Sequence, residues 1–352
     1  MNGARPLRIL FAHDRFAPDF GGGGEYVVLE TARYLQRRGH QVSVLTTGDP
    51  ALTDYEGIPT RRLAIPRARL NLAWREVAAA AREADVIHCF TFHSAYPALR
   101  AARALGKPVV CGVLALFGKS VWRDMKGGVV GRAFAAFERR MVGLPFDARI
   151  YLSESSERLA RDLGVHRPSD VVIEPGISID DYAAAEHKDG VLFSGKLDVR
   201  KGLDVVLAAA ECLPEIPFRV LCWGGGLESL AKSATPNLAV DPFESRARLA
   251  RALAAARIFV FPTRAETFGI VVAEAMASGC AVVSTSPLPF EGERIPPNDV
   301  EATVRAIRRL WDDPQRCAEA GRRNAEIAKR FSWPVHAEAV EGLYRRLLEG
   351  AR

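Results

Sequence analysis

Hydrophobic and polar positions divide the chain into two kinds of segment. Short runs rich in Val, Ile, Leu and Phe are separated by longer stretches rich in Ala, Leu and Arg. This alternation is typical of βαβ units, in which helices cover a parallel sheet. In the first half the pattern predicts helices over 26–38 and 72–83. It predicts strands over 7–12, 41–46, 86–89, 109–113 and 149–152.

The series of strands restarts after residue 189. Strands are expected over 190–194, 219–222, 238–240, 258–261 and 281–284. Helices are expected over 203–212, 246–256, 271–277 and 300–311. The pattern therefore predicts an α/β protein with two doubly wound, Rossmann-like domains. The polar stretch 178–189 is the best candidate for the linker.

Composition agrees with a globular two-domain chain. Of 352 residues, 48% are hydrophobic and 26% are charged, which excludes a disordered chain, a collagen or a coiled coil. The formal net charge is +6, and the six cysteines form no C-x-x-C pair, so reduced, buried thiols are expected. No signal peptide is visible, and the longest apolar run, 108–118, is too short to cross a bilayer. A cytoplasmic location is expected.

Ligands of open α/β sheets bind beyond the carboxyl ends of the strands, so two such sheets predict a site in the cleft between them. The first segment of interest is the glycine run 21–24, between a strand and a helix. Its backbone N–H groups suit a phosphate at the helix N-terminus. Tyr26 stands where a dinucleotide fingerprint has its third glycine, which excludes that motif. A mobile loop without a ligand is the alternative.

A basic turn follows the first strand of the second half. The segment 194–202 reads S-G-K-L-D-V-R-K-G and places Lys196, Arg200 and Lys201 at a strand-to-helix turn. Ammonium and guanidinium donors in such a turn suit a diphosphate. A solvated basic turn is the alternative.

The most informative segment is 261–279, where a strand ends at Pro262 and a helix begins near Gly269. Glu266 lies before this helix, and Glu274 follows eight residues later. Free N–H groups at 268–270 would face an anion, and the two carboxylates would accept hydrogen bonds from hydroxyl groups. A helix cap at Glu266 and a structural ion pair at Glu274 are the alternatives.

These motifs together resemble those of the family-4 retaining glycosyltransferases of the GT-B fold. The likeness rests on E-x7-E at 266–274, G-K-L-x-x-x-K-G at 195–202 and G-G-x-E at 22–25. G-H-Q-V at 39–42, I-E-P-G-I at 173–177 and F-S-W at 331–333 agree with it. The resemblance covers nearly the whole chain.

The resemblance implies an acceptor-side domain over 1–178 and a nucleotide-sugar domain over 179–332. A final helix in 333–352 would pack back on the first domain. Glu274 would bind the donor ribose, and Glu266 would hold the transferred sugar. Lys196 and Lys201 would neutralise the diphosphate. The residues implied to contact the donor are Gly22, Gly23, Lys196, Arg200, Lys201, Thr267, Phe268, Gly269, Ile270 and Glu274.

The family often has a histidine near the transferred sugar, at the end of the strand expected at 86–89. His88 and His93 are both candidates, and His93 is preferred because it follows the strand end. We therefore expect Glu266, His93 and Lys196 to take part in catalysis. The chain departs from the family at Lys196, which replaces an arginine, and at 287–293, where a longer glycine-rich loop is compressed.

The implied reaction moves a sugar from a UDP- or GDP-sugar to a hydroxyl acceptor with retention, in polysaccharide, glycolipid or glycoconjugate synthesis. No metal and no cofactor are expected, since the chain has no D-x-D motif. The basic and apolar segment 119–140 would suit an anionic membrane at its inner face; a solvated helix packed through Phe134 and Phe137 is the alternative. No nucleic-acid module is present. A GT-B nucleotide-sugar epimerase and a non-catalytic nucleotide-sugar-binding partner protein stay open as other functions.

Overall fold

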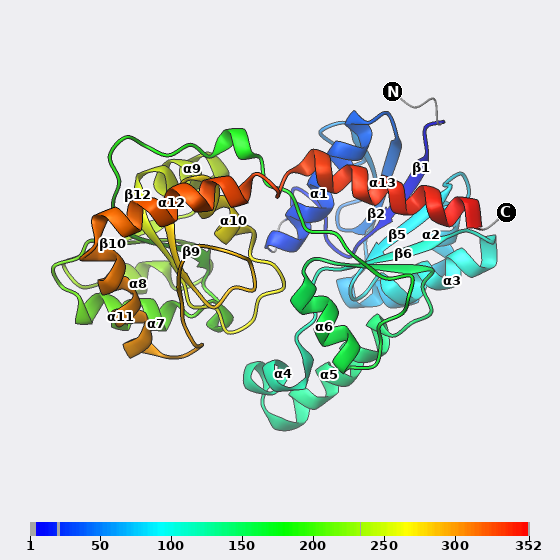
Figure 1. Cartoon of the computed structure of the whole chain (residues 1–352). Helices are drawn as coiled ribbons and strands as arrows, with labels where there is room; N and C mark the ends of the chain where they lie inside the picture. The colour runs from blue at the N-terminus through cyan, green and yellow to red at the C-terminus, as the bar shows by residue number, and fades with distance from the viewer. Residues whose placement is uncertain (1–4, 20–21, 233, 351–352) are drawn as a thin grey trace. The chain divides into compact units, whose positions relative to one another are not determined.

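The computed structural model describes residues 5–19, 22–232 and 234–350. The chain forms two compact units (Figure 1). The first comprises Met1–Gly176 and Trp333–Arg352, and the second comprises Ile177–Ser332. The first crossing between the units falls two residues before the boundary expected at 178, and the second falls at the expected 332–333.

The first unit is built on a sheet of order β3-β4-β2-β1-β5-β6-β7-β8. All neighbours in this sheet are parallel except β3 and β4. The strands are β1 (Arg8–Ala12), β2 (Gln41–Thr47), β3 (Asp54–Tyr55), β4 (Ile58–Leu63), β5 (Val86–Phe90), β6 (Val109–Val113), β7 (Ala148–Tyr151) and β8 (Val171–Val172).

Helices cover both faces of this sheet. They are α1 (Gly23–Arg37), α2 (Trp74–Ala80), α3 (Ala95–Leu105), α4 (Gly118–Lys126), α5 (Gly128–Val142), α6 (Glu154–Asp162) and α13 (Trp333–Gly350), with the 3-10 helix η1 (Arg67–Leu72) before α2. Successive side chains of β1 alternate between the faces: Leu10 packs in the core under α2 and α3, and Phe11 in the core under α1 and α13. Because both faces are buried, the central strands read as continuous apolar runs.

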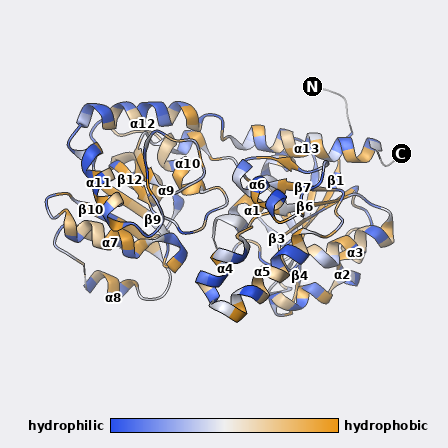
Figure 2. Cartoon of the chain, turned by 60° about the horizontal axis from the view of Figure 1, so that its bottom comes forward, coloured by the Kyte–Doolittle hydropathy of each residue, from blue (hydrophilic) through white to orange (hydrophobic). Residues whose placement is uncertain are grey.

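The second unit has an all-parallel sheet of order β11-β10-β9-β12-β13-β14. Its strands are β9 (Asp189–Lys196), β10 (Phe218–Trp223), β11 (Leu238–Pro242), β12 (Ala256–Phe261), β13 (Ala281–Ser284) and β14 (Gly292–Arg294). Its helices are α7 (Leu203–Cys212), α8 (Leu227–Lys232), α9 (Arg246–Ala255), α10 (Ile270–Ala277), α11 (Val300–Trp311) and α12 (Pro314–Ala328), with the 3-10 turns η2 (Ile179–Asp181) and η3 (Val199–Lys201). Figure 2 shows the apolar strands inside both units and polar residues on the helices around them.

Two Rossmann-like α/β units with parallel sheets confirm the predicted fold class. The order β9-β12-β13 brings three strand ends together, so the basic turn after β9 lies beside the segment after β12. In the first unit β1 and β5 are neighbours. The start of α1 and the residues after β5 therefore share the carboxyl edge of that sheet.

The stretch 178–189 is not a free linker, contrary to the sequence prediction. Tyr182 is only 6% exposed, and its hydroxyl donates a hydrogen bond to the Glu274 carboxylate. The Lys188 ammonium donates to the carbonyl oxygen of Ser278 at 2.5 Å. These contacts hold the stretch against the second unit. The stretch is anchored at Tyr182 and Lys188, while most of its other polar residues are exposed.

Within the described part of the chain, no helix has the length and apolar character needed to cross a membrane.

Candidate active site

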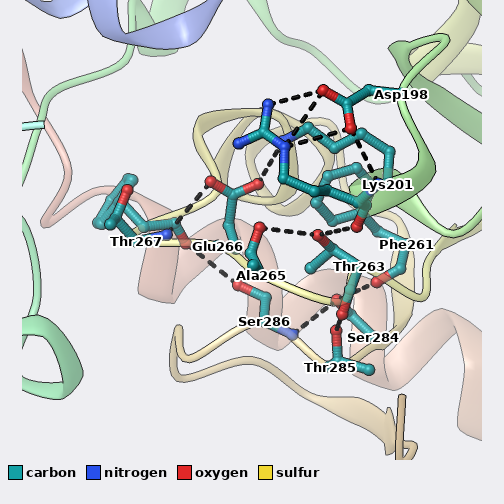
Figure 3. A network of polar contacts seen from close by, with 12 residues as sticks. Asp198, Lys201, Phe261, Thr263, Ala265, Glu266, Thr267, Ser284, Thr285 and Ser286 are labelled. Carbon is teal, nitrogen blue, oxygen red and sulfur yellow. Dashed lines mark hydrogen bonds and ion pairs between the residues drawn. The ribbon is translucent and has the colours of Figure 1, made fainter. Parts of the chain in front are cut away.

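The basic turn after β9 meets the predicted carboxylate after β12. The Lys201 ammonium lies 2.6 Å from Oε2 of Glu266 (Figure 3). Oε1 of Glu266 accepts a hydrogen bond from the backbone N–H of Thr267 at 3.3 Å. The side chains of Lys201 and Glu266 are 21% and 16% exposed, so the pair is partly screened from water. Two residues predicted to bind the donor are therefore bound to each other in this structure.

A second cation of the turn is also paired. Nη2 of Arg200 donates to Oδ2 of Asp198 at 2.8 Å, and Nε lies 3.2 Å from both carboxylate oxygens. Burial raises the pKa of Asp198, but the hydrogen bonds from Arg200 outweigh burial and lower this pKa overall. Lys196, at the end of β9, makes no ion pair or hydrogen bond through its side chain with any described residue. Lys196 can therefore bind an anion without breaking an ion pair or hydrogen bond to a described residue.

Glycine at position 202 allows the two loops to approach each other. Gly202 has φ +70°, and a Cβ atom there would lie 2.1 Å from the carbonyl oxygen of Pro262. The backbone N–H of Arg264 and the hydroxyl of Thr263 both donate to the carbonyl oxygen of Arg200, at 2.7 and 3.0 Å. These bonds tie the turn after β9 to the exit of β12.

The N-terminus of α10 offers unpaired backbone donors. Gly269, the residue before the helix, has φ +94°, and the hydroxyl of Ser286 donates to the carbonyl oxygen of Phe268 at 3.1 Å. The N–H groups of Phe268, Gly269 and Ile270 donate to no acceptor among the described residues. Free N–H groups and the positive end of the helix dipole favour an anion here.

Glu274 is held inside the second unit by two partners. It is 1% exposed, and Oε1 accepts a hydrogen bond from the Tyr182 hydroxyl at 2.8 Å. The guanidinium of Arg246, at the start of α9, forms an ion pair with the same oxygen. A buried carboxylate needs such partners. The sequence shows that Glu274 needs a donor, but no motif identifies Tyr182 or Arg246, which lie 92 and 28 residues away.

In the first unit the glycine run leads into α1. Gly22 precedes the helix, Gly23 is its first residue, and no side chain caps this end. A Cβ atom at Gly24 would lie 3.4 Å from a methyl carbon of Leu114, so this part of the helix packs closely. Gly21 lies outside the described residues. Backbone N–H groups at the start of a helix that no described side chain caps again suit a phosphate.

His93 lies after β5 and is half-buried at the carboxyl edge of the sheet. Its Nδ1 atom lies 2.9 Å from the amide nitrogen of Asn71. Desolvation lowers the pKa of His93; Asp14 raises it and Arg67 lowers it further by smaller amounts. The structure therefore places His93 among polar groups from β1, η1 and β5.

His88 has a structural role. It is 2% exposed, and the Tyr344 hydroxyl of α13 lies 2.6 Å from its Nδ1 atom. Burial lowers the pKa of His88 to about 3, so the ring is neutral at physiological pH. Of the two histidines that the sequence left open, His93 lies at the sheet edge and His88 lies in the core.

Sequence reasoning missed an oriented cation next to His93. Oδ2 of Asp14, directly after β1, accepts hydrogen bonds from Nε and Nη2 of Arg67 at 3.0 and 2.8 Å. Asp14 is 3% exposed, and the Arg67 side chain is 45% exposed. A buried carboxylate thus holds a guanidinium whose remaining N–H groups face solvent. The position of Asp14 after a strand was the available signal.

The described residues contain no group of three or more His, Cys, Asp or Glu side chains arranged to hold a metal ion.

Comparison with known proteins assigns the chain to a family. A model of the glycosyl transferase 4-like domain matches residues 22–176, and a model of glycosyl transferases group 1 matches residues 188–313. A phosphatidyl-myo-inositol mannosyltransferase from Mycolicibacterium smegmatis is 29% identical over 369 residues, which cover 93% of this chain and 90% of the relative.

Solved structures show the same fold. Sucrose-phosphate synthase from Thermosynechococcus elongatus has a TM-score of 0.84 at 21% identity, covering 98% of this chain and 100% of that one. HepE from Anabaena, solved in complex with UDP-glucose, has a TM-score of 0.75 at 18% identity, covering 98% of this chain and 99% of that one.

The two Rossmann-like units and the matches to both family models define a glycosyltransferase. The chain belongs to the family-4-type glycosyltransferases of the GT-B fold.

Proposed function

We propose that this glycosyltransferase moves a sugar from a UDP- or GDP-sugar to a hydroxyl group of its acceptor, with retention of the anomeric configuration and without a metal ion or other cofactor. The observation that carries the proposal is the arrangement around the start of α10. Glu266 and Glu274 flank a set of free backbone N–H groups, and Lys201 lies 2.6 Å from Glu266. The carboxylates can accept hydrogen bonds from the hydroxyl groups of a sugar nucleotide, and the N–H groups and the ammonium can donate to its diphosphate.

The residues of the second unit divide the donor between them. Lys196 and Lys201 neutralise the diphosphate, and Arg200 adds a guanidinium when it leaves Asp198. Glu274 accepts hydrogen bonds from the ribose hydroxyl groups. Glu266, with Thr267 and the N–H groups at 268–270, holds the transferred sugar. The proposal is supported by the common position of most of these groups at the carboxyl edge of one sheet; Glu274 lies further along α10.

The reaction exchanges one bond at the anomeric carbon for another. The bond to the diphosphate oxygen breaks, and a bond to the acceptor oxygen forms on the same face of the sugar. The acceptor proton passes to the leaving diphosphate. Cationic and N–H donors stabilise the charge that develops on this leaving group, which lowers the barrier without a metal ion. Gly22 and Gly23 of the first unit supply further N–H donors, and His93 contacts the transferred sugar.

The names of similar proteins support a lipid-linked acceptor. The relative from M. smegmatis is a phosphatidyl-myo-inositol mannosyltransferase. The neighbour HepE, solved with UDP-glucose, supports the sugar-nucleotide donor instead. The proposal therefore includes a product that is a glycolipid or a related polysaccharide or glycoconjugate. It also includes a cytoplasmic enzyme at the inner face of a membrane, with no role for nucleic acid.

The test compares donor binding and turnover in Glu274→Gln and in a control. Calorimetry with UDP-, GDP- and ADP-sugars identifies the base. Glu274→Gln should weaken binding of that donor by about 10- to 100-fold, since it removes charge-assisted hydrogen bonds. Arg246 is partly exposed, so its guanidinium stays hydrated in this variant. Glu301→Gln, at a side chain that is 86% exposed on α11, should bind the donor as the unmodified protein does.

Product analysis completes the test. Proton NMR of the product should show the anomeric configuration of the donor, and excess chelator should leave turnover unchanged. An inverted product would refute retention. Conversion of the donor to its epimer without an acceptor would indicate an epimerase instead. Donor binding without transfer to any of a broad panel of acceptors would indicate a non-catalytic protein.

A further inference from the structure

A helical hairpin made of α4 and α5 carries an unusual surface. The two helices meet at Gly127, and the Trp122 and Phe134 rings stack with centroids 5.0 Å apart. Gly131 packs so closely that a Cβ atom there would lie 2.5 Å from the carbonyl oxygen of Trp122. Glu138 is 1% exposed and accepts hydrogen bonds from the N–H groups of residues 117 and 118, which begin α4. The hairpin is thus a built element with a defined shape.

Apolar side chains are exposed at the turn of this hairpin. Val129 is 73% exposed, Val130 is 51% exposed and Phe134 is 42% exposed. These three residues lie within six positions at the start of α5. Exposed apolar groups that gather at one place mark an interaction surface more often than scattered ones do.

The same two helices carry exposed cations. Residues 118–142 contain two acids and six cations, so their net charge is 6 − 2 = +4, out of +6 for the whole chain. One acid, Glu138, is buried, and the other, Asp124, pairs with Arg123 at 3.5 Å. The six cations are all exposed: Lys119, Arg123, Lys126, Arg132, Arg139 and Arg140.

We propose that the α4–α5 hairpin docks this enzyme on an anionic lipid surface, with Val129, Val130 and Phe134 entering the interface. This inference rests on one part of the proposed function, the lipid-linked acceptor. Exposed apolar side chains on a hairpin that also carries exposed cations fit the boundary between acyl chains and anionic headgroups. Each cation near such a surface contributes about 1 kcal/mol, which is about fivefold in binding. An acidic protein or a nucleic acid would use the cations but would leave the exposed valines without a partner.

Flotation of the full-length protein with vesicles tests this inference. The vesicles contain phosphatidylcholine alone or phosphatidylcholine with phosphatidylglycerol. Binding should be at least about tenfold stronger to the anionic vesicles. The double variant Val129→Ser/Val130→Ser should reduce that binding at least about tenfold, because both side chains lie in solvent and their loss leaves the fold intact. The control Leu52→Ser/Val335→Ser changes exposed apolar residues of the same unit that lie outside the hairpin.

The outcomes separate the docking proposal from the proposed function. Equal binding to both vesicles, no binding to either, or equal loss in the hairpin variant and the control would overturn the docking proposal. Calorimetry of donor binding is measured in parallel without lipid. Vesicle binding by a protein that binds no sugar nucleotide would refute the proposed function and leave the docking proposal standing.

A second inference follows from the hydrogen bonds of Asn71. Its amide nitrogen lies 3.1 Å from the carbonyl oxygen of Ala68 and 2.9 Å from Nδ1 of His93. A carbonyl oxygen can only accept, so the side of the amide that faces Ala68 is the NH₂ group. The same NH₂ group meets Nδ1 of His93, which must then accept as well. The ring proton of neutral His93 is therefore on Nε2.

We infer that Asn71 is a positioning residue that fixes His93 as a neutral hydrogen-bond donor through Nε2. In the proposed reaction His93 then donates to an oxygen of the transferred sugar and takes no proton from the acceptor. Desolvation lowers the pKa of His93, which keeps the ring neutral. The charged groups that affect it, Asp14 and Arg67, are bound to each other.

Nitrogen-15 NMR of the full-length protein with labelled histidine tests this inference directly. The His93 resonances, assigned with a His93→Gln variant, should show the proton on Nε2. Asn71→Asp should move the proton to Nδ1, since a carboxylate accepts it there, and should shift the acidic limb of the pH–rate profile to higher pH. A proton on Nδ1 in the unmodified protein, or an unshifted profile in Asn71→Asp, would overturn the inference. The NMR result holds whether or not the proposed reaction is correct.

Discussion

The ion pair between Lys201 and Glu266 links two functions that the proposed reaction keeps separate. The ammonium is needed by the diphosphate and the carboxylate by the sugar, yet the two lie 2.6 Å apart without a ligand. Donor binding must therefore break this pair and replace it with two new interactions. Removing the Glu266 carboxylate should therefore alter the binding of a nucleoside diphosphate and of a sugar nucleotide in opposite directions.

The informative change is Glu266→Gln, which keeps the size of the side chain and removes its charge. A charge-assisted hydrogen bond contributes about 1.5–3 kcal/mol, and an exposed ion pair about 0.2–1 kcal/mol. With side chains 21% and 16% exposed, the pair falls between these limits, at about 1 kcal/mol. Releasing Lys201 should strengthen binding of the free nucleoside diphosphate about fivefold. The sugar nucleotide also loses its hydroxyl–carboxylate bonds, so its net affinity should fall about tenfold.

Calorimetry with both ligands measures the two affinities in one protein. Lys201→Met should weaken both ligands, because both carry the diphosphate. Asp204→Asn should change neither: it breaks a neighbouring ion pair with Arg264 whose carboxylate is 65% exposed. If Glu266→Gln weakens the nucleoside diphosphate and the sugar nucleotide by the same factor, the carboxylate contacts no sugar and the reasoning is refuted.

Two further predictions concern the fold that carries the site. Gly202→Ala should lower the free energy of unfolding by about 2–4 kcal/mol, because its Cβ atom would meet a backbone carbonyl oxygen at 2.1 Å and φ is +70°. The control is Gly225→Ala, where nothing lies within 4 Å of the added Cβ atom. Urea denaturation should show that this control changes the free energy of unfolding by less than about 1 kcal/mol. Burial lowers the pKa of His88 to about 3 and of His336 to about 4, so below pH 6.5 the unfolded chain binds protons that the folded chain refuses. The free energy of unfolding should fall by up to about 1.4 kcal/mol per histidine for each pH unit from 6.5 towards 4. Denaturation at pH 7 and pH 5 should show a smaller fall in the double variant His88→Asn/His336→Asn. An unchanged fall would contradict the conclusion that these two buried histidines cause it.

The sequence predicted the central strands well because those strands are buried on both faces. The runs expected at 109–113 and 281–284 have the bounds of β6 and β13, and every residue in them is buried. β4 was missed because one of its faces is exposed: its burial alternates, and it carries polar residues such as Arg61. A strand with one exposed face gives no continuous apolar run.

Helices with small or polar contact surfaces were harder to predict. α12 buries small residues such as Ala320 and Gly321 against β13, so its apolar pattern is weak. The helix expected over 72–83 is present as the shorter α2, and η1 before it ends at Leu72, which is 78% exposed. Hydrophobic periodicity shows where large apolar side chains are buried. It therefore does not predict an element whose packing depends on backbone contacts and small residues.

With Glu274, in the middle of α10, as an exception, most of the predicted site residues lie at the end of a strand, directly after one or at a helix start. That position can be read from a sequence, because the topology of a parallel sheet collects strand ends at one edge. The partners of those residues cannot be read from the sequence. Tyr182 and Arg246 reach Glu274 across the folded unit, and Asn71 reaches His93 from a 3-10 helix. Pairing of this kind depends on side-chain geometry that no spacing rule encodes.

The distribution of charge differs between the two surfaces for which we propose anionic ligands. At the proposed donor site Arg200 and Lys201 are already paired with carboxylates of the same unit. A diphosphate there gains its contacts by exchange with Asp198 and Glu266, which makes binding depend on geometry more than on net charge. The hairpin has no such internal partners for most of its cations, and its net charge is +4. Added salt should therefore weaken vesicle binding far more than donor binding, because exposed charges are screened and partly buried pairs are not.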